Sequence, residues 1–160
     1  MGSVIKLVVS ILACLVAGGI GSLFTFKSIP GWYSSLRKPP YTPPNWVFGP
    51  VWTTLYILMG ISVFLVWQEG LNTDTAVLAF VLFWVQLAVN AVWSIVFFGM
   101  RSKGGAVAVI VVLWLLILAT IIASLGISGW AGGLLIPYIL WVTLASYLNV
   151  GVWLLNRGRT

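Results

Sequence analysis

The sequence contains no histidine, one cysteine and two acidic residues. Without histidine, the chain cannot use imidazole for acid–base catalysis or as a metal ligand. A single cysteine, Cys14, excludes an intrachain disulfide. Two carboxylates, Glu69 and Asp74, are too few for conventional hydrolytic or metal-dependent chemistry. A site in this chain must be built from tryptophan, tyrosine, amide and hydroxyl side chains, and we expect no metal, no cofactor and no conventional enzyme.

Charge is also scarce, because 6% of the residues are charged and 61% are hydrophobic. A soluble domain has about 25% charged residues. Too few charges remain to cover a surface that faces water, so we expect lipid to surround the chain. The net charge of +6 comes from basic residues scattered at the ends of apolar segments. They are typical of membrane anchors and topology signals rather than of a nucleic-acid-binding patch.

Five apolar stretches are long enough to span a membrane, which takes ~20 residues. They cover about residues 4–26, 46–68, 75–99, 104–126 and 134–155. None shows the alternation of barrel strands, and helices satisfy their own backbone in lipid. Three of the connections are short, which favours antiparallel neighbours in one bundle. The sequence therefore predicts an all-α, multi-pass membrane protein with a single domain over residues 1–160.

The basic residues predict the orientation of these spans. One side of the membrane would carry Lys6 alone, and the other side the remaining seven: Lys27, Arg37, Lys38, Arg101, Lys103, Arg157 and Arg159. Cytoplasmic loops carry the excess of lysine and arginine. We therefore expect the N-terminus outside and the first loop and the C-terminus in the cytoplasm. The type of membrane stays open.

The first loop, over residues 27–45, is unusually long for a compact bundle. Loops beyond ~12–15 residues are usually functional or disordered. Five prolines, at positions 30, 39, 40, 43 and 44, reduce the entropy lost on ordering, and the nearby rings of Trp32, Tyr33 and Trp46 disfavour disorder. The loop is therefore either a lid over a cavity or an aromatic anchor in the headgroup layer.

Polar and aromatic residues form stripes inside three of the spans. One stripe has Gln86, Asn90, Trp93 and Ser94, a second has Tyr138, Trp141, Ala145 and Asn149, and a third has Trp52 and Tyr56. Such stripes can join helices by hydrogen bonds or line a pocket for a flat, largely apolar ligand. Small residues in the first span (Ala13, Ala17 and Gly21, and Gly18 with Ser22) indicate close helix packing, within the chain or in a dimer.

Three motifs resemble the TspO/MBR family, the translocator or peripheral-type benzodiazepine-receptor proteins. The most specific runs from Trp32 to Tyr56 and reads WYSSLRKPPYTPPNWVFGPVWTTLY. The second is NAVWSIVFF, from Asn90 to Phe98, and the third is PYILWVTLASYLNVGVWLLN, from Pro137 to Asn156. The resemblance covers nearly the whole chain, but the fourth span carries no signature.

This resemblance implies a five-helix bundle, commonly dimeric, that binds tetrapyrroles such as protoporphyrin IX and haem, or sterols and benzodiazepine-like compounds. The implied pocket residues are Trp32, Tyr33, Trp52, Tyr56, Gln86, Asn90, Trp93, Trp141 and Ala145. The implied lid contains Pro39, Pro40, Pro43, Pro44 and Trp46. One departure concerns sterols: Val150 and Leu154 replace the tyrosine and arginine of the animal cholesterol pattern, which indicates a bacterial or archaeal source.

The expected function is that of a receptor or translocator-like protein in porphyrin sensing, transport or disposal. An alternative is light- and oxygen-dependent degradation of porphyrin, in which Trp52 and Trp141 would take part. A further alternative is a small secondary transporter. Five spans do not divide into two inverted repeats, and no carboxylate lies within a span to carry protons, which disfavours the transporter.

Overall fold

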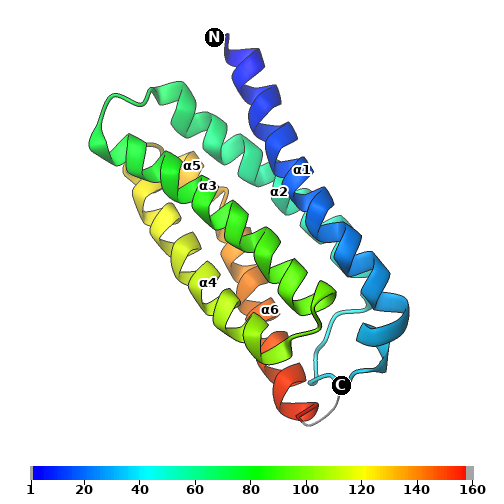
Figure 1. The fold of residues 1–160 in the computed structure, drawn as a ribbon. Helices are drawn as coiled ribbons and strands as arrows, with labels where there is room; N and C mark the ends of the chain where they lie inside the picture. The colour runs from blue at the N-terminus through cyan, green and yellow to red at the C-terminus, as the bar shows by residue number, and fades with distance from the viewer. Residues whose placement is uncertain (1, 158–160) are drawn as a thin grey trace.

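The computed structural model describes residues 2–157 and confirms the all-α class. Over these residues there is no strand, and five helical segments are long and apolar enough to cross a membrane. They are Ser3–Tyr33, Asn45–Glu69, Asp74–Gly99, Lys103–Leu125 and Gly129–Leu155. Figure 1 shows them side by side, with the start of α1 and the end of α6 at opposite ends of the bundle. The chain is an integral, multi-pass membrane protein.

Several spans are divided into shorter elements. These are α1 (Ser3–Ser28), a π-helical turn η1 (Ile29–Tyr33), α2 (Asn45–Glu69), α3 (Asp74–Ser94), a second π-helical turn η2 (Ile95–Gly99), α4 (Lys103–Leu125), the short α5 (Gly129–Gly133) and α6 (Ile136–Leu155). Hydroxyl side chains cap three of the helices: Thr73 before α3, Ser102 before α4 and Ser128 before α5 each accept a hydrogen bond from a backbone N–H. Such caps satisfy donors that have no partner inside the helix.

Two predicted boundaries differ from the structure. The first span continues through η1 to Tyr33, whereas the sequence predicted a loop from residue 27. Pro30 has no N–H to continue the regular α-helical ladder, and the chain widens into a π turn there. The fifth span begins at Gly129 rather than near residue 134, because Ser128 caps α5 and the helix breaks before Pro137.

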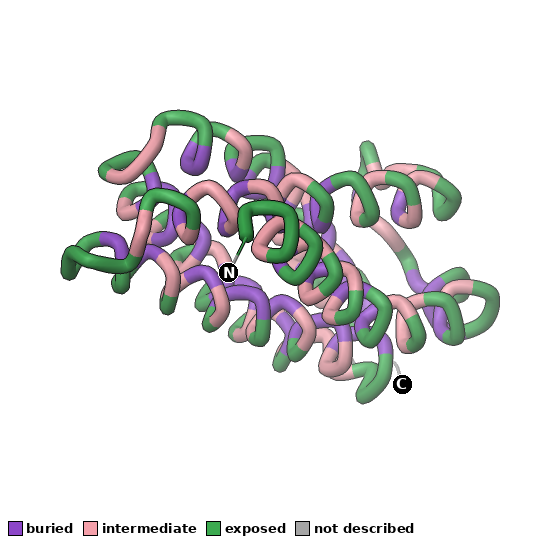
Figure 2. Tube along the Cα trace, turned by 90° about the horizontal axis from the view of Figure 1, so that it is seen from above, coloured by how far each residue is buried: buried purple, intermediate pink, exposed green. Residues whose placement is uncertain are grey.

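Each long helix buries one side in the bundle and exposes its other side to lipid. α1 packs chiefly against α2, α3 against α4, and α4 also against α6. In Figure 2 the buried positions follow the inner sides of the helices. Large apolar side chains such as Leu12, Leu115 and Leu140 are more than half exposed. In water this would be costly, but here these side chains face the hydrocarbon interior of the membrane.

The small residues of α1 serve packing within the chain. A Cβ atom at Gly18 would lie 2.5 Å from a ring carbon of Tyr56, and one at Gly21 would lie 3.1 Å from the hydroxyl of Ser94. Small residues let membrane helices approach closely. Because these two glycines are covered by α2 and α3, they are not free to contact another copy of the chain. A homodimer stays a prediction.

We expect Gly60→Ala to lower the free energy of unfolding by about 1–3 kcal/mol, the usual cost of overpacking. The added Cβ would lie 2.7 Å from the Cα of Ile11, and backbone cannot move aside as a flexible side chain can. The matched control is Gly19→Ala in α1, where no described atom lies within 4 Å. It should be neutral or slightly stabilising, since alanine favours a helix. Unfolding in detergent micelles measures both, and equal values for the two variants would contradict the packing.

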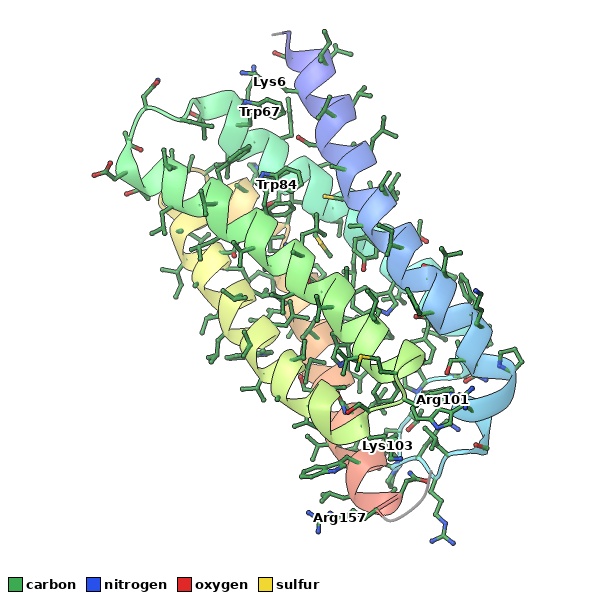
Figure 3. The ribbon with its side chains drawn as sticks, in the orientation of Figure 1. Lys6, Trp67, Trp84, Arg101, Lys103 and Arg157 are labelled. Carbon is green, nitrogen blue, oxygen red and sulfur yellow. The ribbon has the colours of Figure 1, made fainter. Side chains whose placement is uncertain are left out.

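The charged side chains separate toward the two ends of the bundle. Figure 3 shows Lys6 beside Trp67 at one end and Arg101, Lys103 and Arg157 at the other. The acids Glu69 and Asp74 flank the α2–α3 connection, at the end of Lys6. Arg159, which entered the charge count, lies outside the described residues. The orientation across the membrane stays a prediction.

Candidate ligand-binding site

A cavity lined by aromatic rings lies inside the bundle, toward the end that carries the first loop. Its lining comes from α1, η1, α2, α3, η2 and α6: Thr25, Tyr33, Phe48, Trp52, Trp93, Phe97, Phe98, Trp141, Ala145, Leu148, Asn149 and Val152. The cavity has a volume of about 30 Å³, room for only one or two water molecules. The rings fill most of the space, so the site is closed in this structure.

Trp52 is at the centre of these rings. Its ring centroid lies 5.7 Å from that of Tyr56, in a stacked arrangement, and 6.3 Å from that of Trp141, nearly perpendicular to it. The rings of Trp93 and Tyr138 both lie 6.4 Å from it. These separations are within the range of favourable aromatic pairs. Trp52 therefore links rings of α2, α3 and α6 in one cluster.

A second group of rings continues this cluster toward the loop. Tyr33 lies 6.0 Å from Phe48 and 5.6 Å from Phe98, measured between ring centroids. Above Tyr33, the Nζ atom of Lys38 lies 4.7 Å from the ring centroid and donates a hydrogen bond to the carbonyl of Leu36. Partial burial lowers the pKa of the Lys38 ammonium from its ordinary value. The loop end of the cavity thus has a cation over an aromatic wall.

A chain of buried hydrogen bonds lies behind the cavity. The hydroxyl of Tyr56 donates to Oδ1 of Asn90 (2.7 Å), Nδ2 of Asn90 donates to the hydroxyl of Tyr138 (2.6 Å), and that hydroxyl donates to Oε1 of Gln86 (2.7 Å). All four side chains are buried. Nε2 of Gln86 has no partner within residues 2–157. These hydrogen bonds join α2, α3 and α6, the helices that carry the rings of the cavity.

Two indole N–H groups beside the cavity differ in their partners. Nε1 of Trp93 donates to Oδ1 of Asn149 (2.9 Å), and Nδ2 of Asn149 donates to the carbonyl of Lys103 (3.0 Å). The indole of Trp93 is therefore fixed. Nε1 of Trp141 is buried and finds no acceptor in the described part of the chain. It is a donor that a polar group of a ligand could satisfy.

Trp141 also faces the outside of the bundle. An open apolar groove of about 570 Å³ lies between α2 and α6, and its lining includes Pro50, Val51, Leu140 and Trp141. The same indole lines the aromatic cavity. Trp141 therefore borders both the closed cavity and the lipid-facing groove.

The structure places five of the nine predicted pocket residues around the cavity: Tyr33, Trp52, Trp93, Trp141 and Ala145. Tyr56, Gln86 and Asn90 belong to the hydrogen-bonded chain behind it. Trp32 lies apart, edge-on to Phe97 at 5.5 Å, with Arg101 and Lys103 over its ring. The role of each in ligand binding stays a prediction.

Sequence reasoning missed several lining residues that its own motifs contain. Phe48 lies one helical turn before Trp52, and Phe97 lies one turn after Trp93. The i, i+4 spacing puts such pairs on one face of a helix, and this spacing could have identified both. Leu148 and Val152 continue the face of Trp141 and Ala145 on α6 at helical spacing, whereas Thr25 carries no such signal. No group of side chains that could hold a metal ion occurs among the described residues.

The first loop is docked on the end of α6. Asn156 accepts from the backbone N–H of Arg37 (3.0 Å) and donates to its carbonyl (2.7 Å). The hydroxyl of Tyr147 donates to the carbonyl of Pro40. A Cβ at Gly151 would lie 2.6 Å from the ring of Pro39, so only glycine allows this approach.

The residues predicted to form the lid lie outside the cavity lining. Pro39, Pro40, Pro43, Pro44 and Trp46 are all absent from the described wall of the cavity. The side chain of Trp46 is 75% exposed, which suits an anchor at the membrane surface. Two residues that precede α2 in the sequence do line the aromatic cavity: Thr25 of α1 and Tyr33 of η1.

We expect Asn156→Ala to release the loop. Each of the two hydrogen bonds to Arg37 is worth about 0.5–1.5 kcal/mol, so the open loop should become about tenfold more populated. Trypsin cleavage between Arg37 and Lys38, measured in micelles, should accelerate by the same factor. The control Asn72→Ala changes an exposed amide in the α2–α3 connection and should leave the rate unchanged. Equal rates in both variants would show that Asn156 does not hold the loop.

The protein is a small helical bundle in the membrane, with an aromatic cavity inside it and a proline-rich loop docked at one end. These features define a membrane protein with a candidate ligand site. The chain belongs to the TspO/MBR family, whose model matches residues 10–154. It is 43% identical over 154 residues to "Tryptophan-rich protein TspO" of Archaeoglobus fulgidus, covering 96% of this chain and 99% of that protein. It is 41% identical over 140 residues to the human "Translocator protein" (87% and 83%). It is 43% identical over 129 residues to "Tryptophan-rich sensory protein" of Cereibacter sphaeroides (80% and 78%).

Proposed function

We propose that this protein is a membrane receptor or sensor that binds a tetrapyrrole, such as protoporphyrin IX or haem, in the aromatic cavity. The observation that carries the proposal is the ring cluster around Trp52, beside the unpartnered indole N–H of Trp141. A receptor or sensor role is supported by family membership and by the names of two relatives, a translocator protein and a sensory protein.

The chemistry of the cavity suits this ligand class. A tetrapyrrole is flat and largely apolar, and it stacks on indole and phenol rings. Its two carboxylates need cations, and Lys38 lies over Tyr33 at the loop end of the cavity. The side-chain carboxylates of the chain, Glu69 and Asp74, lie at the opposite end and would not repel them. Charge and shape thus favour one orientation, with the ring system among the indoles and the acids toward the loop.

Binding requires the closed cavity to open. A volume of about 30 Å³ cannot hold a macrocycle, so rings that now touch must separate around it. Trp141 borders both the cavity and the outer groove, and it has no hydrogen bond through its N–H to lose in the described chain. Opening there admits a ligand dissolved in the membrane, whereas movement of the loop admits one from the expected cytoplasmic side. The cost of opening is part of the measured affinity.

The test is a titration of the purified full-length protein with protoporphyrin IX in detergent micelles. Tryptophan fluorescence should be quenched to a saturating value at one ligand per chain. The same sample under illumination in air tests the alternative, porphyrin degradation, which would give one defined product. Quenching that never saturates, or that persists equally after denaturation, would rule out a specific pocket.

A further inference from the structure

A second hollow, separate from the aromatic cavity, lies where the end of α1 meets the end of η2. It has a volume of about 210 Å³ and is lined by Phe24, Lys27, Ser28, Phe98, Gly99 and Arg101. A Cβ at Gly99 would lie 2.6 Å from the ring of Phe24, so the two segments touch at its wall. Phe98 lines both this hollow and the aromatic cavity, and its ring separates them.

The hollow is positively charged. Lys27 comes from α1 and Arg101 from the turn before α4, so two separate segments bring their cations to one place. The guanidinium of Arg101 lies 6.0 Å from the ring centroid of Trp32, within the range of a cation–π contact. Arg101 is at the loop end of the bundle in Figure 3, far from the α2–α3 connection that carries Glu69 and Asp74. No side-chain carboxylate of the described residues is therefore placed to neutralise the hollow.

A buried hydroxyl completes the wall. Ser28 is 4% exposed, and its Oγ has no hydrogen-bond partner in the part of the chain that the structure describes. Buried polar groups normally have partners, and Ser28 lines the same hollow as the two cations. An anion with several acceptor oxygens would satisfy the hydroxyl, the ammonium and the guanidinium together. Charge-assisted bonds from lysine and arginine to phosphate are among the strongest of their kind.

We propose that this hollow binds a phosphate group through Lys27, Ser28 and Arg101, and that the phosphate belongs to an anionic phospholipid. The apolar walls, Phe24 and Phe98, favour a lipid over free phosphate because such rings can pack against glycerol and acyl carbons. The hollow also lies near the ends of two membrane spans, Ser3–Tyr33 and Asp74–Gly99, close to the level at which headgroups are found. The proposal does not depend on tetrapyrrole binding.

The experiment measures lipid retention by the intact protein with native mass spectrometry, after titration with phosphatidylglycerol or phosphatidylcholine. We expect one phosphatidylglycerol to bind at least about tenfold more tightly than phosphatidylcholine, since each cation near the surface contributes measurably to binding an anionic lipid. Lys27→Gln and Arg101→Gln should each reduce this preference about fivefold. Ser28→Ala should also reduce it, which attraction by scattered charges alone would not produce.

The matched control is Lys6→Gln, which removes one cation over an aromatic ring at the opposite end of the bundle. It should leave the preference unchanged, and circular dichroism should show that all variants remain helical. If millimolar inorganic phosphate displaces the lipid and itself shows the same dependence on Arg101 and Ser28, the phosphate site stands and free phosphate is its source. Equal binding of both lipids, or a preference lost equally in Lys6→Gln, would overturn the proposal.

Discussion

Replacing Trp52 and Trp141 together by alanine should raise the dissociation constant for protoporphyrin IX about 100-fold. The two rings come from α2 and α6 and lie 6.3 Å apart at nearly 90°, so they can contact different parts of one flat ligand. A stacking aromatic side chain typically contributes about 1–3 kcal/mol, and 1.4 kcal/mol corresponds to a factor of ten. The loss is measured by the quenching titration, with haem as a second ligand.

The control must remove a tryptophan without touching the cavity. Trp130 is 74% exposed in α5, so Trp130→Ala should change the total fluorescence but not the affinity. Trp141→Phe keeps a ring and removes the unpartnered N–H, so its affinity should fall between wild type and Trp141→Ala if the ligand accepts that hydrogen bond. A folded double variant with wild-type affinity would place the ligand elsewhere in the molecule.

The helices could be predicted from the sequence because their physical requirement is simple. A stretch of about 20 apolar residues must be helical in lipid, and the spans found in the structure begin and end within a few residues of the predicted ones in three cases. The exceptions are informative. Pro30 and Gly31, and the glycines of residues 129–133, are typical of loops. Yet residues 29–33 continue the first span as a π turn, and residues 129–133 begin the fifth span as a short capped helix.

Neighbouring residues of one motif received different environments, and the sequence alone could not assign them. Trp32 and Tyr33 are adjacent, but a helical turn points them in different directions. Tyr33 therefore lines the cavity, whereas Trp32 lies under Arg101. The sequence predicted a loop at these positions, and a loop has no repeating geometry from which the direction of each side chain could be predicted. The closed state is equally beyond the sequence, because a volume depends on how rings from several helices interlock.

The stripe on α3 shows both the strength and the limit of periodicity. The four-residue spacing of Gln86 and Asn90 correctly placed both on the inner face, where they are buried. Two interpretations then remained, interhelical hydrogen bonds or pocket lining. The structure gives both amides hydrogen bonds to the same residue of α6, Tyr138, while Trp93 of the same stripe lines the cavity. The α3 stripe therefore contains both kinds of residue: Gln86 and Asn90 form hydrogen bonds between helices, and Trp93 lines the cavity.

Tyr138→Phe should lower the free energy of unfolding by about 2–6 kcal/mol. The hydroxyl of Tyr138 accepts from Nδ2 of Asn90 and donates to Oε1 of Gln86, and removing it leaves both groups buried without a partner. Each such loss costs about 1–3 kcal/mol. Bonds between membrane helices often contribute less, but this hydroxyl serves two at once, in a site from which water is excluded. Thermal or denaturant unfolding in micelles measures the change.

Tyr41→Phe provides the control, because Tyr41 is 91% exposed. Its hydroxyl can form hydrogen bonds with water in both the folded and the unfolded protein, so its removal should leave the free energy of unfolding unchanged. A second test uses a double-mutant cycle with Gln86→Leu. When the acceptor is also removed, Tyr138→Phe should cost less than it does alone, by about 1 kcal/mol or more. Additive effects would mean that the two side chains do not interact.

The same hydrogen-bond network includes Tyr56, whose ring stacks on Trp52. Tyr138→Phe should therefore also weaken protoporphyrin IX binding, although Tyr138 is not part of the cavity lining.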